Sequence, residues 1–260
     1  MNDAPAPPRA AIRVTWWGHA SVLIEDGARV LTDPVLTMRV MHLRRRAGDK
    51  PPEEARRCDV AVISHLHPDH LHLPSLALLE PGTTVLVPQG GARLLDGLDL
   101  RVVEVSAGQE VTAGNARVSV VPAAHSDRRW PWGSVRARAV GYLVTGSGTT
   151  YFAGDTAPFP EMARLHANLD LALVPVGGWG PWLRGQHLNP AEAACCLRAL
   201  RPRVAVPIHY GTFWPHGMGW VRPQAFYEPG LRFAAHAQSE SPDVQVRLLA
   251  PGTSTEMVLR

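Results

Sequence analysis

A short stretch rich in metal-binding side chains, residues 64–70, constrains what this chain can fold into more than any other feature. It follows an apolar run, residues 60–63, that is typical of a buried strand. Its histidines and its aspartate stand in the order His-x-His-x-Asp-His. A helical zinc site would place two histidines four residues apart, and Pro68 moves His67 towards an extended backbone. The stretch therefore predicts a metal-binding loop at the end of a strand.

Imidazole and carboxylate side chains together suit zinc, manganese or iron rather than calcium. A lone histidine is usually just a polar residue at the surface or at the edge of the core. Four candidate ligands gathered directly after one strand are much harder to explain in that way. The motif therefore indicates a metal site.

Three more candidate ligands, His125, Asp155 and His209, each stand just beyond a predicted strand. Gly154 allows the backbone to come close to a buried centre. Each of the three is weak alone, but two divalent metals need about six or seven protein ligands if each keeps a place for water or substrate. The complete set of candidate metal ligands is His65, His67, Asp69, His70, His125, Asp155 and His209.

The hydrophobic pattern predicts two series of strands interleaved with helices. Three consecutive antiparallel strands are expected at 12–17, 21–25 and 29–32, and a long basic connection at 35–57 is typical of a lid or binding loop. Further strands are expected at 59–63, 84–87, 101–105, 117–121, 139–145, 149–153, 169–174, 204–208 and 244–249, and helices at 73–80, 90–95, 161–167, 190–200 and 228–239. Turn residues at 113–115 and 146–148 indicate two hairpins, one formed by residue 111 and the strand 117–121 and one by the strands 139–145 and 149–153.

The helix expected at 190–200 has the clearest start. Asn189 suits the N-cap, Pro190 the first helical position and Glu192 the third, as in a capping box. With two sheets inside and helices outside, we expect an α+β fold in a single domain over residues 11–260, after a Pro/Ala-rich tail at 1–10.

Composition excludes several classes of protein. The chain has 260 residues, is 45% apolar and has a net charge of +3. No apolar stretch approaches the roughly 18 residues of a membrane span, and the N-terminus lacks the apolar region of a signal peptide. Two of the three cysteines are adjacent, which argues against a disulfide framework. We therefore expect a cytoplasmic protein with reduced thiols and no transmembrane segment.

The densest basic patch, residues 44–46 within the 35–57 connection, has two interpretations. We prefer a solvated loop, because Asp49, Glu53 and Glu54 dilute the charge. The alternative is a lip that attracts an anionic substrate. We expect no nucleic-acid partner.

Over residues 12–249 the chain resembles the metallo-β-lactamase superfamily, and this resemblance implies a four-layer αββα sandwich. It is most similar to the branch that contains ascorbate-6-phosphate lactonase and N-acyl-phosphatidylethanolamine phospholipase D, although residues 128–133 differ from the phospholipase. Besides the His-x-His-x-Asp-His motif, the matching segments are residues 17–21, 32–34, 122–126, 154–156, 187–193 and 209–213.

The resemblance implies a division of the ligands between two divalent ions, with Zn²⁺ first and Mn²⁺ or Fe²⁺ as alternatives. A hydroxide between the two ions would be the nucleophile, since coordination lowers the pKa of water towards about 7. The bond cleaved would be an ester, lactone or phosphodiester, and Asp69 would also carry a proton towards the leaving group. Metal 1 would take His65, His67 and His125, metal 2 would take Asp69, His70 and His209, and Asp155 would bridge them.

Three other polar residues have two readings each. His187 precedes the 190–200 helix, and the resemblance implies a catalytic contact to substrate; otherwise it is a loop histidine. Asp33 could orient a metal-bound histidine or merely form an Asp-Pro turn. His19 has a family position near the core, and a buried, hydrogen-bonded histidine explains it equally well.

Tryptophans are concentrated in loops around the ligand-bearing strands. They could pack the loops or form an aromatic wall for a substrate with an apolar part. Arg128 and Arg184 could then meet an anionic group, so we expect a small anionic or lipid-like substrate. A homo-oligomer is a separate expectation. The six tryptophans concerned are Trp130, Trp132, Trp179, Trp182, Trp214 and Trp220.

Two other functions remain open at this point. A nuclease of the same superfamily would usually add a separate domain, and none is visible in the sequence. A non-catalytic metal-binding or sensor protein would not need the complete ligand set.

Overall fold

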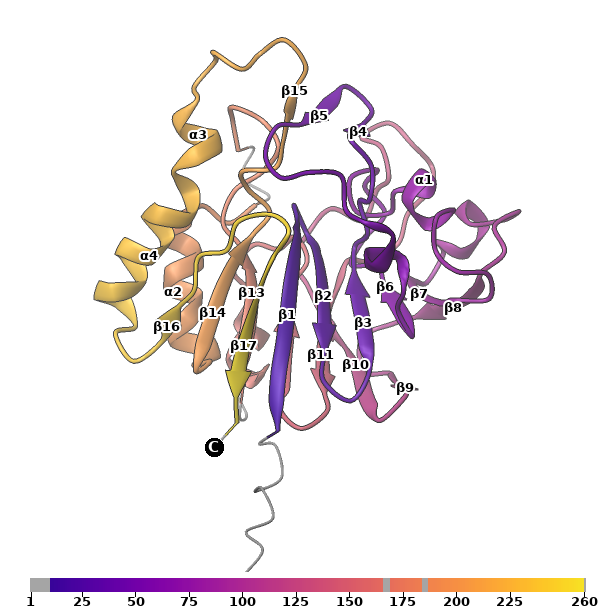
Figure 1. Ribbon diagram of the computed structural model, residues 1–260, viewed down its shortest axis with the longest axis horizontal. Helices are drawn as coiled ribbons and strands as arrows, with labels where there is room; N and C mark the ends of the chain where they lie inside the picture. Colours follow the sequence, from indigo (N-terminus) through magenta and orange to yellow (C-terminus); the bar gives the residue numbers. More distant parts are fainter. Residues whose placement is uncertain (1–9, 166–168, 184–186, 260) are drawn as a thin grey trace, which may run out of the picture.

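The computed structural model describes residues 10–165, 169–183 and 187–259. Nearly all of the tail expected at 1–10 lies outside this part, as do His166 and Arg184. Two sheets pack face to face, and the longer helices cover the outer side of one of them (Figure 1). The α+β sandwich expected from the sequence is therefore present.

The first sheet has seven strands in the order β17-β1-β2-β3-β6-β7-β8. Its β1–β2–β3 meander is antiparallel, as predicted, and the strands from β3 to β8 run parallel. No strand was expected at β17, which pairs antiparallel with β1. The bounds are β1 Ala11–Gly18, β2 Ser21–Glu25, β3 Arg29–Thr32, β6 Val60–Val62, β7 Thr84–Pro88, β8 Arg101–Val105 and β17 Thr253–Val258.

The second sheet also has seven strands, in the order β16-β14-β13-β12-β11-β10-β9. The two predicted hairpins, β9–β10 and β11–β12, are confirmed, and β12, β13, β14 and β16 run parallel. The strand expected at 244–249 is much shorter. The bounds are β9 Glu110–Ala113, β10 Ala116–Pro122, β11 Val140–Thr145, β12 Thr149–Phe152, β13 Leu171–Pro175, β14 Val204–Ile208 and β16 Gln245–Val246.

The 35–57 connection forms part of a third, three-stranded sheet with the order β15-β5-β4. β4 (Arg39–Val40) and β5 (Leu43–Arg45) form a hairpin, and β5 pairs with β15 (Phe213–Pro215). Because β15 begins only four residues after His209, this small sheet lies at the same end of the molecule as the predicted metal motif (Figure 1).

The preferred reading of residues 44–46 as a solvated patch is wrong for Arg45. Its side chain is buried and donates hydrogen bonds to the carbonyls of Trp17 (2.8 Å) and Val35 (3.0 Å). Its guanidinium also lies over the ring of Phe213, 4.8 Å from the centroid. Burial lowers its pKa to about 10. Arg45 therefore ties the small sheet to the core, whereas Arg44 and Arg46 are exposed.

Helix α2 begins as the sequence predicts. The Asn189 side chain accepts hydrogen bonds from the backbone N–H groups of Ala191 and Glu192, and Glu192 accepts one from Asn189 in return. Helices expected at 73–80 and 90–95 are reduced to single turns, and the described residues of the helix expected at 161–167 form a 3₁₀ helix. The bounds are α1 Leu73–Leu76, α2 Pro190–Leu200, α3 Gln224–Tyr227 and α4 Pro229–Glu240, with 3₁₀ turns η1 Glu53–Arg56, η2 Ala92–Leu94 and η3 Pro160–Leu165.

Three apolar layers fill the sandwich. The largest lies between the sheets, around Trp16, Tyr142 and Phe152. A second packs the other face of the β9–β16 sheet against α2 and α4, and a third packs the outer face of the first sheet against α1 and its neighbouring turns. Each fully buried large side chain contributes about 1.5–3 kcal/mol. In the described part of the chain, no helix is both long and apolar enough to cross a membrane.

Candidate metal centre

The metal motif follows β6, and the other candidate ligands follow β10, β12 and β14. β6 belongs to one sheet, and β10, β12 and β14 belong to the other. The packing of the sheets therefore brings together side chains that are up to 144 residues apart, from His65 to His209.

One group of imidazoles consists of His65, His67 and His125. Nδ1 of His67 lies 2.8 Å from Nε2 of His65 and 3.2 Å from Nε2 of His125. Nitrogen ligands at about 2.0–2.1 Å from a tetrahedral zinc lie roughly 3.4 Å from one another. The three nitrogens are thus gathered closely enough to share one cation.

A second group consists of Asp69, His70, His209 and also His19. The Nε2 atoms of His70 and His209 lie 3.0 Å apart. Oδ2 of Asp69 lies 3.6 Å from Nε2 of His70 and 3.8 Å from Nε2 of His209. This group offers two imidazole nitrogens and a carboxylate to a second cation, while His19 contacts the carboxylate.

Asp155 stands between the two groups. Its Oδ2 lies 3.2 Å from Nε2 of His70 and 3.9 Å from Nε2 of both His65 and His125, and its Oδ1 lies 3.3 Å from Nε2 of His209. The side chain is buried, and among the described residues neither oxygen has a hydrogen-bond donor. A buried carboxylate without donors is costly. Cations on both sides would satisfy it, so the residues fit a two-metal site.

The electrostatics of the cluster favour metal binding. Burial raises the pKa of the Asp155 carboxyl, but His209 and His70 outweigh this and hold it well below its usual range. Burial, together with His70, lowers the pKa of His65 well below its usual value, and burial also lowers that of His67. The carboxylate is therefore ionised and these imidazoles are neutral, which are the protonation states that metal ligands require.

His70 is the exception in this cluster. Burial lowers its pKa, but the carboxylates of Asp155, Asp69 and Asp33 together raise it well above the usual value. Three carboxylates around one imidazole attract a positive charge to this position. A metal cation bound there would supply that charge and leave the imidazole neutral.

Outer contacts orient the imidazoles. Asp33 accepts hydrogen bonds from the backbone N–H of Ser64 (2.7 Å) and from its hydroxyl (2.6 Å), and its Oδ2 lies 2.6 Å from Nδ1 of His70. Nδ1 of His65 can then donate to the Ser64 hydroxyl at 2.9 Å, and Nδ1 of His209 to the Gly177 carbonyl at 3.2 Å. Each contact leaves Nε2 directed at the centre as an acceptor. Asp33 therefore does more than form a turn.

Three of the six described non-glycine residues with a positive φ angle belong to the site. His19, Asp33 and His209 have φ angles of 54°, 31° and 61°, in the left-handed region that few residues other than glycine adopt. Such conformations cost on the order of 1–3 kcal/mol each and are found mainly at functional sites. The rest of the fold holds these three side chains in place.

His19 belongs to the site, although the sequence did not identify it as a candidate ligand. It is buried, its Nε2 lies 2.9 Å from Oδ2 of Asp69, and its ring lies 4.1 Å from that of His209 between centroids. The feature of the sequence that could have identified His19 is its position after Gly18, at the sharp corner between β1 and β2.

His187 also reaches the centre. Its Nδ1 lies 3.2 Å from Oδ2 of Asp155 without the alignment of a hydrogen bond, and its ring lies 5.1 Å from that of His125. Burial lowers its pKa, but Asp155 raises it above the usual value. Unlike the buried imidazoles, its side chain is 20% exposed, on the side of an open cleft.

The cleft beside the centre has a volume of about 800 Å³. Trp130, Trp132 and Trp179 line it, and their contact with a substrate stays a prediction. Trp182 lines an adjoining cavity of about 580 Å³, whereas Trp214 is buried in the packing and Trp220 is exposed. Cleft residues are Val40, Met41, His42, Leu43, His67, Pro68, Asp69, Ser126, Arg128, Arg129, Trp130, Pro131, Trp132, Trp179 and His187.

Comparison with known proteins agrees with this arrangement. A family model described as a Beta-lactamase superfamily domain matches residues 28–210. A UPF0173 metal-dependent hydrolase of Aeropyrum pernix is 31% identical over 94% of this chain and 97% of its own. A UPF0173 metal-dependent hydrolase of Archaeoglobus fulgidus is 29% identical over 94% of this chain and 99% of its own.

Among solved structures, the chain is similar to Igni18, described as a novel metallo hydrolase from Ignicoccus hospitalis. The TM-score is 0.73 at 21% identity, covering 96% of this chain and 100% of that one. At this identity the likeness concerns the fold.

Proposed function

The chain belongs to the metallo-β-lactamase superfamily, within which its relatives are named metal-dependent hydrolases, and we propose that it hydrolyses its substrate with two divalent metal ions. The proposed bond is an ester, a lactone or a phosphodiester, in a small anionic or lipid-like molecule. This is the chemistry of the branch with ascorbate-6-phosphate lactonase and N-acyl-phosphatidylethanolamine phospholipase D.

One observation carries the proposal: both oxygens of the buried Asp155 lack hydrogen-bond donors among the described residues and face imidazoles of two different groups. A shared carboxylate offsets the repulsion between two cations about 3.5–4 Å apart. In the proposed assignment, metal 1 is held by His65, His67 and His125, metal 2 by Asp69, His70 and His209, and both by Asp155.

Two such ions, most simply Zn²⁺, would supply Lewis-acid polarisation of the substrate and a water of lowered pKa. The protein holds their ligands in place through Asp33, Ser64 and the Gly177 carbonyl. The buried centre borders the cleft, where Asp69 and His187 would meet the substrate.

Asp69 and His187 are the proposed catalytic side chains. Oδ2 of Asp69 is held by His19, and its carboxylate lines the cleft, so it can carry a proton towards a leaving group. His187 lies beside Asp155, which raises its pKa and so favours a cationic imidazole beside developing negative charge.

The proposal is tested by metal analysis together with an activity panel. The wild-type protein should bind two metals per chain and Asp69→Ala about one, with the exposed-histidine variant His236→Ala as a matched control. Metal-loaded protein should turn over at least one of a set of esters, lactones and bis-p-nitrophenyl phosphate with Zn²⁺ or Mn²⁺. A wild-type protein that binds no metal would contradict the site.

The other outcomes identify the competing functions. Metal-dependent cleavage of homopolymer DNA or RNA would indicate a nuclease, and two bound metals without turnover of any substrate would indicate a non-catalytic metal protein. A single domain over residues 11–260, a cytoplasmic location and a homo-oligomeric state also stay predictions.

A further inference from the structure

The cleft beside the metal centre has two apolar walls. One is the tip of the loop between β10 and β11, where the rings of Trp130 and Trp132 stack at 6.5 Å with an interplanar angle of 13°. The other contains Met41 and Trp179, with the ring of His42 edge-on to Trp179 at 5.2 Å. A cleft of this size and composition suits a molecule with an aromatic or alkyl body.

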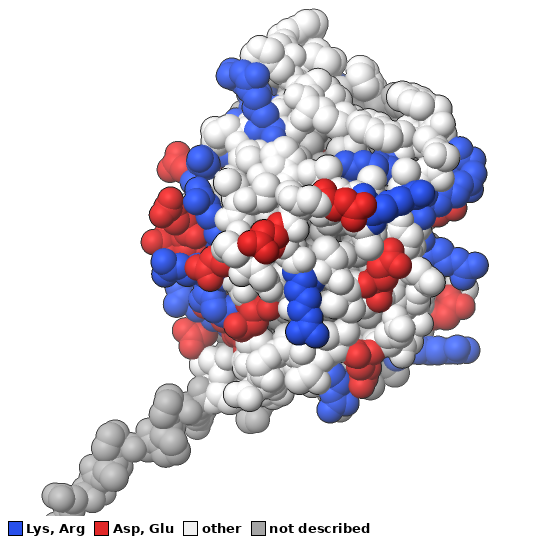
Figure 2. Space-filling model, turned by 90° about the vertical axis from the view of Figure 1, so that its right-hand side faces the viewer, with Lys and Arg blue, Asp and Glu red and all other residues white. Residues whose placement is uncertain are grey.

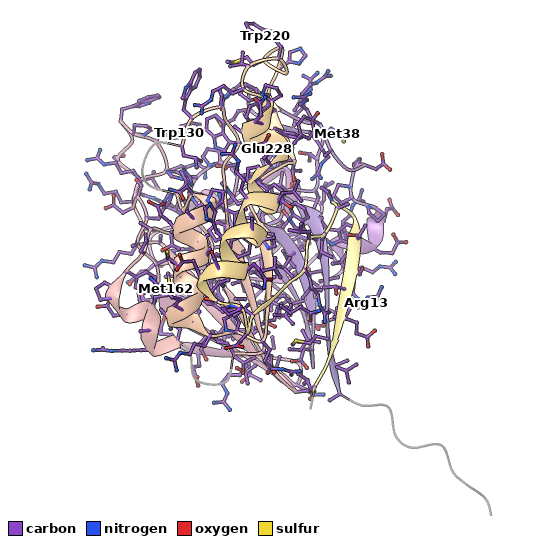
Figure 3. The ribbon with its side chains drawn as sticks, turned by 90° about the vertical axis from the view of Figure 1, so that its left-hand side faces the viewer. Arg13, Met38, Trp130, Met162, Trp220 and Glu228 are labelled. Atoms are coloured by element: carbon purple, nitrogen blue, oxygen red, sulfur yellow. The ribbon has the colours of Figure 1, made fainter. Side chains whose placement is uncertain are left out.

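The tryptophan-bearing wall is a loop that backbone hydrogen bonds close on itself. The backbone N–H of Ala137 donates to Asp127 (2.8 Å), that of Arg129 to Val135 (3.1 Å) and that of Gly133 to Trp130 (2.9 Å). These contacts hold the two sides of the loop together, and Trp132 projects from its tip with 83% of its surface exposed. Trp130 lies with Met38 and Trp220 at one end of the molecule (Figure 3).

Exposed arginines stand on the two strands beside the cleft, Arg39 on β4 and Arg44 on β5. Elsewhere, the upper end of the face visible in Figure 2 shows few charged side chains, while charges of both signs cover its middle. The cleft itself contains two further arginines, Arg128 and Arg129.

The loop that carries the metal motif holds the side chain of Arg129 in place. Its Nη1 donates to the carbonyl of Leu66 at 2.7 Å and lies 3.4 Å from that of Leu71, and both carbonyls belong to the loop that carries the metal motif. A guanidinium has five N–H donors in a rigid fork. Among the described residues, neither Nε nor Nη2 of Arg129 has a hydrogen-bond or ion-pair partner, so these donors remain available in the cleft.

The charge of the cleft is unbalanced. Asp69 is the one carboxylate among its described lining residues, and it is already held by His19 and engaged in the centre. Asp127, next to the arginines in sequence, pairs with Arg136 at 3.3 Å. Among the described residues, the side chain of Arg128 donates only to the Pro131 carbonyl, at 3.3 Å. Apart from Asp69, whose charge acts on Arg129 from the centre, the described lining of the cleft presents cationic donors beside apolar walls with no further carboxylate.

We propose that Arg129 is a specificity-determining residue, which binds an acid group of the substrate away from the bond that is cleaved, while the tryptophan-bearing loop and Trp179 hold an aromatic or alkyl body. The substrate is thus an amphiphilic anion. The inference rests on the proposed function for its reaction, but not for its binding step. Its binding can be measured without turnover.

A matched pair of fluorescent probes tests the binding step. 8-Anilinonaphthalene-1-sulfonate carries an acid group, and N-phenyl-1-naphthylamine has the same rings without it. In metal-loaded protein, Arg129→Gln should weaken binding of the sulfonate about 10-fold, the loss expected for one charge-assisted hydrogen-bonded contact, and leave the neutral probe within about 2-fold. Trp132→Ala should weaken both.

Controls separate recognition from loss of structure. Arg101→Gln, on the exposed edge of β8, removes the same charge from another surface and should change neither probe. Arg129→Lys keeps the charge but loses the fork, and should recover only part of the affinity. Each variant must keep the wild-type metal content, since Arg129 also contacts the motif loop.

The reaction adds a second readout. For p-nitrophenyl hemisuccinate against p-nitrophenyl butyrate, Arg129→Gln should lower kcat/KM about 10-fold for the anionic ester, mainly through KM, and change the neutral ester by less than about 2-fold. Equal losses for both probes, or none for the sulfonate, would overturn the role of Arg129. Absence of turnover with normal probe binding would instead contradict the proposed hydrolysis.

Discussion

Nε2 of His19 lies 2.9 Å from Oδ2 of Asp69, and both side chains are buried. Burial and the neighbouring His209 lower the pKa of His19 to about 3. The imidazole is therefore neutral at physiological pH and donates its one N–H through Nε2. This contact fixes one oxygen of Asp69 and directs the carboxylate towards His70 and His209.

Replacing His19 should therefore weaken one metal site selectively. In His19→Ala, Asp69 loses its donor, and we expect a 10–100-fold loss of affinity at the Asp69 site, the range for loss of an outer contact to a ligand. Competition with a chromogenic chelator measures both affinities. His19→Gln, which keeps a donor, should restore part of the loss. If the affinities of both metal sites are unchanged, Asp69 does not need the hydrogen bond from His19 to bind metal.

Asp33→Asn removes a buried charge without changing shape. The variant leaves the hydroxyl of Ser64 and Nδ1 of His70 without their anionic partner. Breaking a buried charged contact costs about 3–5 kcal/mol, and denaturant unfolding should show a loss of this size together with weaker metal binding. The exposed Asp96→Asn serves as the control, with a change within about 0.5 kcal/mol. A similarly small change in the stability of Asp33→Asn would show that Asp33 only forms the Asp-Pro turn.

Removal of metal should destabilise the native protein. Without cations, the buried carboxylate of Asp155 faces the imidazoles with no compensating ion. A ligand present at about 1,000 times its Kd adds roughly 4 kcal/mol of stability, so a chelator should lower Tm by on the order of 10 °C. Zn²⁺ should restore the transition and Mg²⁺ should not, because the site is rich in nitrogen donors. A Tm insensitive to chelation would argue against bound metal.

Arg45 should be essential for the small sheet over the site. Arg45→Met fills the space but leaves the carbonyls of Trp17 and Val35 unpaired in the interior. We expect a loss of about 2–4 kcal/mol and faster hydrogen exchange in β4 and β5. Arg44→Met, at an exposed neighbouring position, should have little effect. Equal protection in both variants would show that the backbone pairing alone holds the sheet.

Local patterns were enough to predict much of this molecule. Alternating apolar residues indicated the β1–β3 meander, and turn residues indicated the two hairpins of the second sheet. Asn189, Pro190 and Glu192 predicted the start of α2. These features depend on residues close together in the chain, whose conformations are restricted by sterics and by local hydrogen bonds. The order of candidate ligands along the chain indicated the metal centre for the same reason.

Contacts between distant segments decided the rest. β17 is a strand because it pairs with β1, and Thr15 and Ser254 meet there across 239 residues. Arg45 is buried because it donates to carbonyls from two other segments, that of Trp17 at the end of β1 and that of Val35 after β3. Nothing near Arg45 in the sequence distinguishes it from its exposed neighbours Arg44 and Arg46.

The sequence by itself determined which side chains can bind metal and on which strand ends they stand, because those properties are chemical and local. Only the tertiary structure decided that His19 supports Asp69, that both oxygens of Asp155 face two groups of imidazoles, and that Arg129 lines an apolar cleft. The physical reason is that distances between side chains from separate strands follow from how the two sheets pack, and that packing is a property of the whole chain.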